Sequence, residues 1–151
     1  MIWQVMPLVE VKSMNVQLDP GAYMPEKHYR EDAGFDLRTP ERFVLRAHSF
    51  KVIDTGVHIE VPYGCVAMIK SKSGLMCNKG ITTDGTVDCG YSGSIRVCLF
   101  NHSGEHHIFE KGDKIAQLVI MLILNPEIEL HQVAQVEARE RGINGFGSTG
   151  K

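Results

Sequence analysis

Cysteine is scarce in this chain of 151 residues, and its four cysteines include no C-x-x-C pair. That spacing is typical of structural zinc sites and of redox motifs, so the sequence supports neither. Reduced thiols are the default in a reducing compartment, which agrees with the cytoplasmic location that we expect from the absence of a signal peptide. The four are Cys65, Cys77, Cys89 and Cys98.

Long apolar runs and an excess of charge are also missing. No apolar stretch approaches the roughly 20 residues that a membrane-spanning helix needs. Lysine and arginine total 16 against 18 aspartate and glutamate residues, and the formal net charge is −2. A nucleic-acid coat or a membrane-surface role therefore has no electrostatic support. Residues 1–6 lack a basic region and a cleavage site, so we expect no signal peptide.

The chain does contain a succession of short strand-like runs separated by Gly and Pro turns. Residues 57–61 alternate apolar and polar side chains with period two, which is typical of a half-buried strand. Residues 115–124 are nearly continuous apolar sequence, short for a helix without caps, and are expected to form a buried strand. Strands at this spacing predict one all-β domain, a sandwich or a barrel. The other expected strands are residues 43–45, 50–54, 65–70 and 94–100.

Residues 73–80 are the exception, because they can form one or two helical turns. Ser73 is the expected N-cap of this helix, and Gly80 is its expected C-terminal stop. A helix N-terminus attracts anions, and Lys70 and Lys72 precede this one.

A small polar cluster follows the expected strand 94–100 and has two interpretations. It consists of His102, Glu105, His106 and His107. Metal binding is one interpretation, and an exposed turn is the favoured one, because ligand spacing at strand borders is absent. The sequence leaves the role of the three histidines open.

The last eleven residues, 141–151, contain four glycines and cannot bury enough apolar surface to fold alone. They can be a disordered, Gly-rich end. They also hold the parts needed to close over a phosphorylated ligand with a flat ring. Arg141 can fork onto phosphate oxygens, and Phe146 can stack on a base. We therefore divide the chain into a β-barrel domain, residues 1–136, and a flexible C-terminal arm, residues 137–151.

Five short segments stand out in order along the chain: residues 33–38, 72–75, 85–93, 112–118 and 141–151. Each alone is weak, since an Asp beside glycine in a β-protein is usually a turn residue. Together, from about Ala33 to Gly150, they resemble the motifs of the deoxyuridine triphosphatase (dUTPase) family. The resemblance implies an all-β, jelly-roll-like homotrimer that hydrolyses dUTP to dUMP and pyrophosphate. Such an enzyme lowers the dUTP pool and supplies dUMP for thymidylate synthesis.

The resemblance assigns the central chemistry to two residues of the third segment. Asp88 would be the general base that orients and deprotonates the attacking water. Tyr91 would pack beneath the deoxyribose and exclude a 2′-hydroxyl. Without the resemblance, Asp88 would serve equally well as a turn acceptor and Tyr91 as a half-buried strand-edge tyrosine.

The resemblance also assigns the phosphate contacts. Lys72, which stands where relatives usually have Arg, would neutralise phosphate charge without the guanidinium fork. Ser73 and Gly74 would bind α- and β-phosphate oxygens, and Gln117 would reach another phosphate oxygen. Gln117 could instead be a polar strand residue bonded to backbone. Asp36 would organise the phosphate and metal surroundings or support a neighbouring cation.

Uracil would be recognised by backbone groups of the segment before Asp88, with Gly85 and Thr86 as contacts. Relatives carry a longer hairpin with an Asn followed by Ser-Pro-Gly, whereas residues 80–85 form a shorter segment without that Asn. Arg96 matches a strand position that contacts uracil through its main chain.

In the arm, the resemblance places Arg141 on the γ-phosphate and Phe146 over uracil, with Ser148 and Thr149 on phosphate. The arm of one protomer would close the site of another. Mg²⁺ is the implied cofactor, held mainly by the triphosphate and water rather than by protein ligands.

Two rival functions remain. One is a dCTP deaminase of the same superfamily, although the spacing of Asp88 and Tyr91 favours the phosphohydrolase. The other is a nucleotide-responsive module that binds a regulatory protein partner, which the sequence does not identify.

Overall fold

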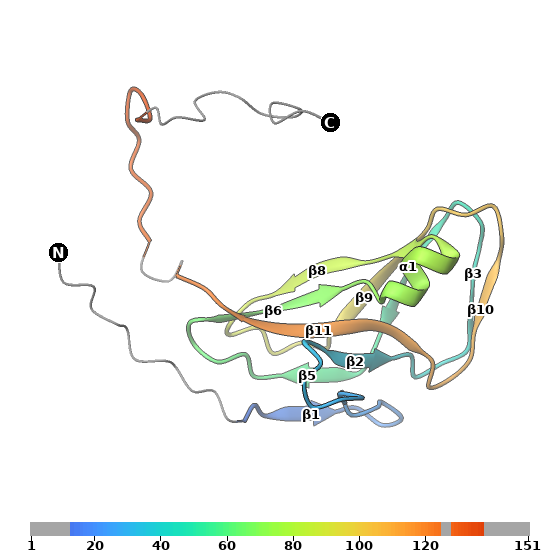
Figure 1. The fold of residues 1–151 in the computed structure, drawn as a ribbon. Helices are drawn as coiled ribbons and strands as arrows, with labels where there is room; N and C mark the ends of the chain where they lie inside the picture. Colours follow the sequence, from blue (N-terminus) through green and yellow to red (C-terminus); the bar gives the residue numbers. More distant parts are fainter. Residues whose placement is uncertain (1–12, 125–127, 138–151) are drawn as a thin grey trace.

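The computed structural model describes residues 13–124 and 128–137 (Figure 1), and in this part the secondary structure is mostly strand with one short helix. The all-β prediction is thus confirmed. No helix in residues 13–124 or 128–137 is long and apolar enough to cross a membrane. The elements are β1 (Val16–Leu18), β2 (Phe35–Arg38), β3 (Phe43–Leu45), β4 (Phe50–Asp54), β5 (Val57–Ile59), β6 (Cys65–Lys70), α1 (Ser73–Lys79), β7 (Ile81–Thr82), β8 (Asp84–Val87), β9 (Arg96–Asn101), β10 (His107–Phe109) and β11 (Lys114–Leu122).

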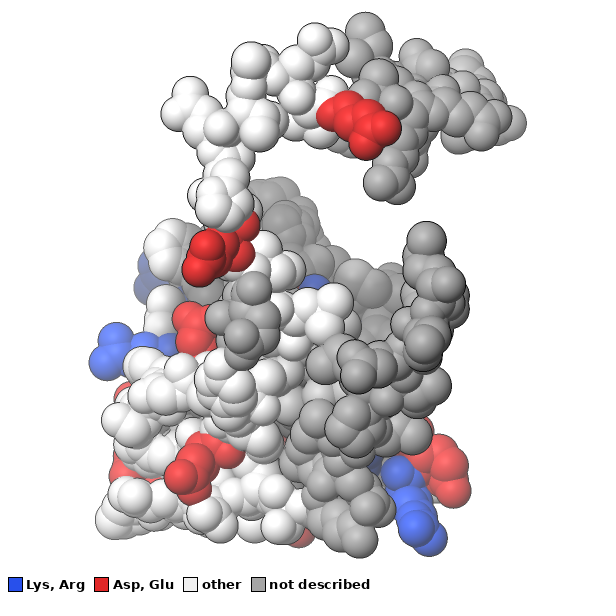
Figure 2. Space-filling view, turned by 90° about the vertical axis from the view of Figure 1, so that its left-hand side faces the viewer, with Lys and Arg blue, Asp and Glu red and all other residues white. Residues whose placement is uncertain are grey.

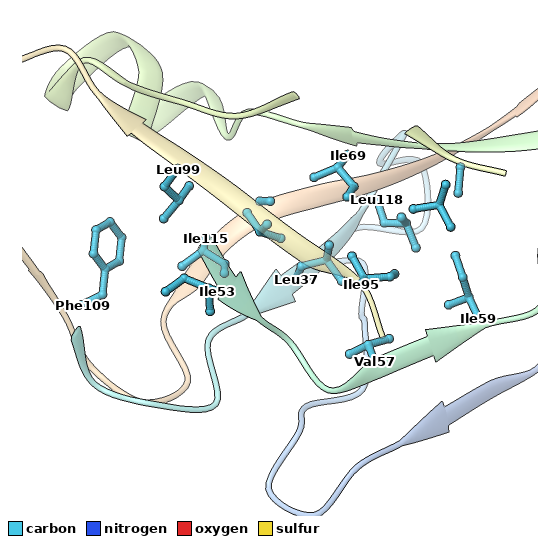
Figure 3. Close-up of a cluster of buried hydrophobic side chains, with 14 of the residues drawn as sticks. Leu37, Ile53, Val57, Ile59, Ile69, Ile95, Leu99, Phe109, Ile115 and Leu118 are labelled. Atoms are coloured by element: carbon cyan, nitrogen blue, oxygen red, sulfur yellow. The ribbon is translucent and has the colours of Figure 1, made fainter. Parts of the chain in front are cut away.

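Two antiparallel sheets enclose the core. The four-stranded sheet has the order β2-β11-β6-β8, and the three-stranded sheet has the order β4-β9-β7. Side chains from both sheets, such as Leu118 and Leu99, converge between the ribbons (Figure 3), and both are almost completely buried. Burying one such side chain stabilises the fold by about 1.5–3 kcal/mol. Two further strand pairs, β1-β5 and β10-β3, extend this sandwich.

The expected strands are all present: β3, β4 and β6 have the predicted bounds, and the other three have shifted ends. β5 stops at Ile59, β9 runs from Arg96 to Asn101, and β11 runs from Lys114 to Leu122. The expectation that 115–124 would be buried throughout is wrong, because Met121 and Leu122 are more than half exposed. Five strands of only two to four residues were not predicted: β1, β2, β7, β8 and β10.

The helix α1 forms where it was expected, but the predicted N-cap is wrong by one residue. Lys72, not Ser73, is the N-cap, because Lys72 keeps an extended backbone while its carbonyl oxygen accepts the N–H of Met76 at 2.9 Å. No side chain caps this end. Gly80 ends the helix as expected, at a left-handed φ of 64° that favours glycine.

Residues 80–85, which stand where relatives have a longer hairpin, do not form a hairpin. Ile81–Thr82 (β7) pairs with β9, whereas Asp84–Val87 (β8) pairs with β6 in the other sheet. The chain changes sheets at Thr83, whose N–H donates to Ser71 Oγ at 2.9 Å. The reversal that joins β8 to β9 lies later, at residues 88–95, which we call the β8–β9 turn.

Residues 128–137 extend away from the strands (Figure 1) and contain no strand or helix. Apolar side chains in this segment are strongly exposed, among them Leu130 and Val136. The boundary between residues 136 and 137 stays a prediction, because residues 138–151 lie outside the described part of the chain.

Candidate active site

A cleft of about 230 Å³ opens where β8 and β9 separate into different sheets. The β8–β9 turn forms one wall, and β6 contributes Ile69. Five of the residues predicted from the sequence meet here. The lining residues are Ile69, Gly85, Thr86, Val87, Asp88, Tyr91, Ser94, Ile95 and Arg96.

Tyr91 is fixed in this turn by three local contacts. Its hydroxyl donates to the carbonyl oxygen of Ser94 at 3.1 Å, and its N–H donates to the carbonyl oxygen of Asp88 at 3.2 Å. The ring lies against Gly93, where an added Cβ would come within 2.6 Å of Tyr91 Cζ. Gly93 is therefore a site residue that the sequence analysis did not single out, although it lies at the end of the third segment.

Asp88 directly follows the last residue of β8, and its side chain is exposed at the cleft. The preceding residue, Val87, is buried in the core, and this burial fixes the position of the Asp88 backbone. An exposed carboxylate at a cleft mouth can hydrogen-bond to a water in the cleft, which is the first geometric requirement for a general base.

A second group of predicted residues gathers around Asp36 on β2, which is 8% exposed. Lys72 binds its Oδ1, and Lys114 binds its Oδ2 at 2.6 Å. Burial taken alone would raise the pKa of Asp36, but the hydrogen bonds from Lys114 and Lys72 outweigh it and hold that pKa below its ordinary value. Lys114 was not predicted, and its only signal was its place inside the fourth segment.

Gln117 lies on β11, opposite Asp36 on β2 and Lys70 on β6. Its Nε2 donates to the carbonyl oxygen of Ser71 at 3.0 Å, which is the competing interpretation given above. Its Oε1 lies close to Gly34: a Cβ added at Gly34 would be 2.9 Å from this oxygen. A phosphate contact would have to use the second amide hydrogen.

The two groups flank strand β6. On one side Met68 and Ile69 pair with Thr86 and Gly85 of the cleft, and on the other side Lys70 pairs with Gln117. Ser73 and Gly74 form the first turn of α1, directly after Lys72. The predicted arm residues Arg141, Phe146, Ser148 and Thr149 lie outside the described residues.

The histidine cluster forms hydrogen bonds at the other end of the sandwich. His106 Nδ1 accepts the N–H of Ala47 at 2.9 Å, His102 contacts the Thr82 hydroxyl at 2.8 Å, and His107 contacts the Ser103 hydroxyl at 3.2 Å. Within residues 13–124 and 128–137, no three His, Cys, Asp or Glu side chains are placed to share a metal ion.

Charge is dispersed over the face in Figure 2, where no continuous basic patch is visible among the described residues. Two lysines, Lys72 and Lys114, lie together beside Asp36 and are paired with its carboxylate. An all-β frame with a carboxylate and an aromatic ring at one cleft, and paired lysines across the neighbouring strand, defines the class of this protein. It is a two-sheet β-sandwich with a cleft lined by Asp88 and Tyr91 on one side of β6 and an Asp36–Lys72–Lys114 cluster on the other side.

Comparison with known proteins narrows this class. A family model described as dUTPase matches residues 21–150. The deoxyuridine 5'-triphosphate nucleotidohydrolase of Candida albicans is 38% identical over 146 residues, 95% of this chain and 92% of that protein. The Staphylococcus bacteriophage 80alpha dUTPase with dUPNHPP has a TM-score of 0.82 at 32% identity, over 93% of this chain and 100% of that one.

A mutant dUTPase from phage phi11 of S. aureus, described for its coordination of a structural Mg(II) ion, has a TM-score of 0.74 at 30% identity. That match covers 82% of this chain and 97% of the phage chain. From these findings, the chain belongs to the dUTPase family.

Proposed function

We propose that this chain hydrolyses dUTP to dUMP and pyrophosphate, which lowers the dUTP pool and supplies dUMP. The observation that carries the proposal is the cleft of the β8–β9 turn, where Asp88 and Tyr91 line the same 230 Å³ space. Family membership identifies dUTP as the substrate, and the cleft contains a carboxylate and an aromatic ring.

Asp88 is the proposed general base. It accepts a proton from a water as the water oxygen bonds to the α-phosphorus. The bond between that phosphorus and the bridging oxygen breaks, and pyrophosphate leaves with the electron pair. The exposed position of Asp88 at the cleft mouth leaves room for this water.

Tyr91 is the proposed wall beneath the deoxyribose. Its hydroxyl is bonded to Ser94 and its ring lies against Gly93, and in this position the ring would exclude a 2′-hydroxyl. Gly85, Thr86 and Arg96 line the same cleft and would present main-chain groups to uracil. Because residues 80–85 are not a hairpin, the β8 backbone itself would make these contacts.

Lys72 and Lys114 are the proposed phosphate-facing charges. Asp36 holds both ammonium groups, so it would fix their positions rather than touch the substrate itself. Ser73 and Gly74 follow Lys72 directly and would add a hydroxyl and a backbone N–H. Gln117 can contribute only its remaining amide hydrogen.

Mg²⁺ is the proposed cofactor, bound mainly through the triphosphate. The donor set fits this arrangement, because the described part of the cleft offers one carboxylate, Asp88, and no three-residue ligand cluster. Mg²⁺ prefers several waters together with substrate oxygens. When bound, it would supply neutralisation of the phosphate charge.

The proposed assembly is a jelly-roll-like homotrimer in which the arm of one protomer reaches another protomer's site. Two features of the described chain support it. The outer face of the β4-β9-β7 sheet exposes Phe50, Val52 and Phe100, and residues 128–137 expose Leu130 and Val136. Apolar surface of this kind is typical of subunit interfaces. The four free cysteines suit the proposed cytoplasmic location.

Product analysis tests the activity. The protein is incubated with dUTP and, separately, with dCTP in the presence of Mg²⁺, and pyrophosphate and base identity are measured. The proposal expects pyrophosphate and dUMP from dUTP, and unchanged dCTP. Deamination of dCTP, or nucleotide binding without turnover, would contradict it.

A further inference from the structure

His58 on β5 connects two segments that are distant in the sequence. Its Nδ1 lies 2.8 Å from the carbonyl oxygen of Ser92, and its Nε2 lies 3.2 Å from Oδ1 of Asp19. Ser92 belongs to the β8–β9 turn, and Asp19 directly follows β1. The ring therefore bridges the turn that carries Asp88 and the β1-β5 strand pair.

The chemistry of the two partners defines the protonation state that this bridge requires. The Ser92 carbonyl oxygen and the Asp19 carboxylate are both acceptors, so each ring nitrogen must donate a hydrogen. Only the imidazolium form has two N–H groups. A neutral ring can keep one of the two bonds and must lose the other.

The charges around His58 favour that cationic form. The hydrogen bond to Ser92 is the largest effect that raises the pKa of His58 above its ordinary value, followed by the hydrogen bond to Asp19. Asp54, at the end of β4, adds a smaller attraction in the same direction. Arg96 acts on Asp54, and Glu60 shares a cleft with His58.

That cleft, of about 380 Å³, lies between the β8–β9 turn and the strands β1 and β5. Tyr91 lines it and also lines the 230 Å³ cleft of the proposed active site. The turn therefore has open space on both sides of Tyr91. Its far end is held by main-chain bonds of Ile95 to Val57 and Thr55, whereas Ser92 in its middle is held by His58.

We propose that His58 is a positioning residue whose doubly protonated ring clamps the β8–β9 turn and thereby places Tyr91 and Asp88 for dUTP. The inference rests on the proposed function, because it concerns the same cleft. The clamp is complete below the ordinary histidine pKa of about 6.5 and is lost as the pH rises through the higher pKa of the folded protein. The KM for dUTP should rise over that interval.

The clamp can be tested without catalysis. In the full chain, the His58 ring ¹³C shift and the Tyr91 and Ser92 amide shifts are followed by NMR from about pH 6 to 9. We expect one shared midpoint above about 6.5, and Asp19→Asn should lower that midpoint for all three signals. The proposal would be overturned if the Tyr91 and Ser92 amide shifts did not change with the His58 titration. It would also be overturned if Asp19→Asn left the midpoint of the titration unchanged.

Kinetics supply the second readout. In His58→Gln, KM should no longer change with pH over this interval and should stay about 2- to 10-fold above the low-pH value of the unmodified protein, as expected for one lost hydrogen bond. His106→Gln is the matched control, because His106 bonds Ala47 away from the turn and should keep the pH dependence of KM. A wild-type pH profile in His58→Gln would overturn the clamp. If the unmodified protein does not hydrolyse dUTP, the proposed function is wrong. The NMR titration would still show whether His58 clamps the β8–β9 turn.

Discussion

The ring of Tyr91 lies directly against Gly93, where an added Cβ would come within 2.6 Å of Tyr91 Cζ and closer still to its hydroxyl. Only glycine leaves room for the ring in this position. The absence of a side chain at Gly93 therefore determines where the Tyr91 ring lies, and the proposed sugar contact depends on both residues.

Gly93→Ala should displace Tyr91 without touching the substrate. The new methyl group forces the ring to move, since a Cβ contact below 3 Å does not occur in real proteins. We expect the ratio of kcat/KM for dUTP over UTP to fall by about tenfold or more, which corresponds to about 1.4 kcal/mol. Steady-state kinetics with both nucleotides measures it. An unchanged ratio would show that the ring position does not select the sugar.

Tyr91→Ala should have the same effect in a stronger form. Removal of the ring leaves space beneath C2′, so UTP should gain relative to dUTP. The same two-substrate kinetics measures the ratio. If Tyr91→Ala lowers both activities equally and leaves the ratio intact, Tyr91 has no part in sugar selection.

Asp88→Asn should retain dUTP binding and lose most turnover. The amide preserves the shape of the side chain but cannot accept a proton from water. Loss of one general base costs about 10²–10⁴-fold in rate. Titration calorimetry gives the affinity and pyrophosphate release gives the rate. Turnover near the wild-type rate would remove Asp88 from the role of base.

Asp36→Asn should destabilise the protein, because it leaves the ammonium groups of Lys72 and Lys114 without their carboxylate. The loss of charged hydrogen bonds at this site should cost about 1–3 kcal/mol of unfolding free energy. Since the folded-state pKa of Asp36 is lowered, its contribution is present above about pH 4 and disappears as the pH falls through that lower pKa. Urea unfolding at several pH values measures both effects.

Asp84→Asn is the matched control for that experiment. Asp84 pairs with Lys70 at 2.5 Å, but its side chain is 69% exposed. Because solvent screens exposed pairs, this variant should change the unfolding free energy much less. Equal effects of the two substitutions would contradict the special role of the buried carboxylate.

Truncation after Glu140 should leave a folded protein that hydrolyses dUTP very slowly. Residues 141–151 have almost no core-forming side chains, so the melting temperature should barely change. Phe146→Ala should reproduce part of the loss, since one stacked base is worth about 1–3 kcal/mol. Full activity after truncation would make the arm a passive end, and a collapsed melting temperature would make it structural.

The predictable part of the fold was the part with strong alternation or continuous apolar sequence. Val57 and Ile59 are buried on either side of His58, as period two requires. β7 and β8 were not found, because Thr83 carries the chain between two sheets and no local pattern records a change of sheet. Asp88 and Tyr91 were predicted together because they lie three residues apart in one motif.

Contacts between side chains from distant segments could not be predicted from the sequence. Asp36 and Lys114 are 78 positions apart in the numbering (114 − 36), and only the pairing of β11 with β2 brings them together. The N-cap was misplaced because Ser73 is the better capping residue by propensity, whereas the backbone begins the helix at Lys72. His58 gave no signal at all, since its two acceptors lie 39 and 34 positions away.

The ion triad of Asp36, Lys72 and Lys114 also has a consequence for the local attraction of anions. One carboxylate already neutralises one of the two ammonium groups, so the cluster carries a single net positive charge. Such a cluster attracts a phosphate group less strongly than two unpaired lysines would, and this holds for a triphosphate and for pyrophosphate. At the proposed phosphate region, Asp36 therefore weakens the electrostatic attraction that Lys72 and Lys114 would exert on a phosphate group if both ammonium groups were unpaired.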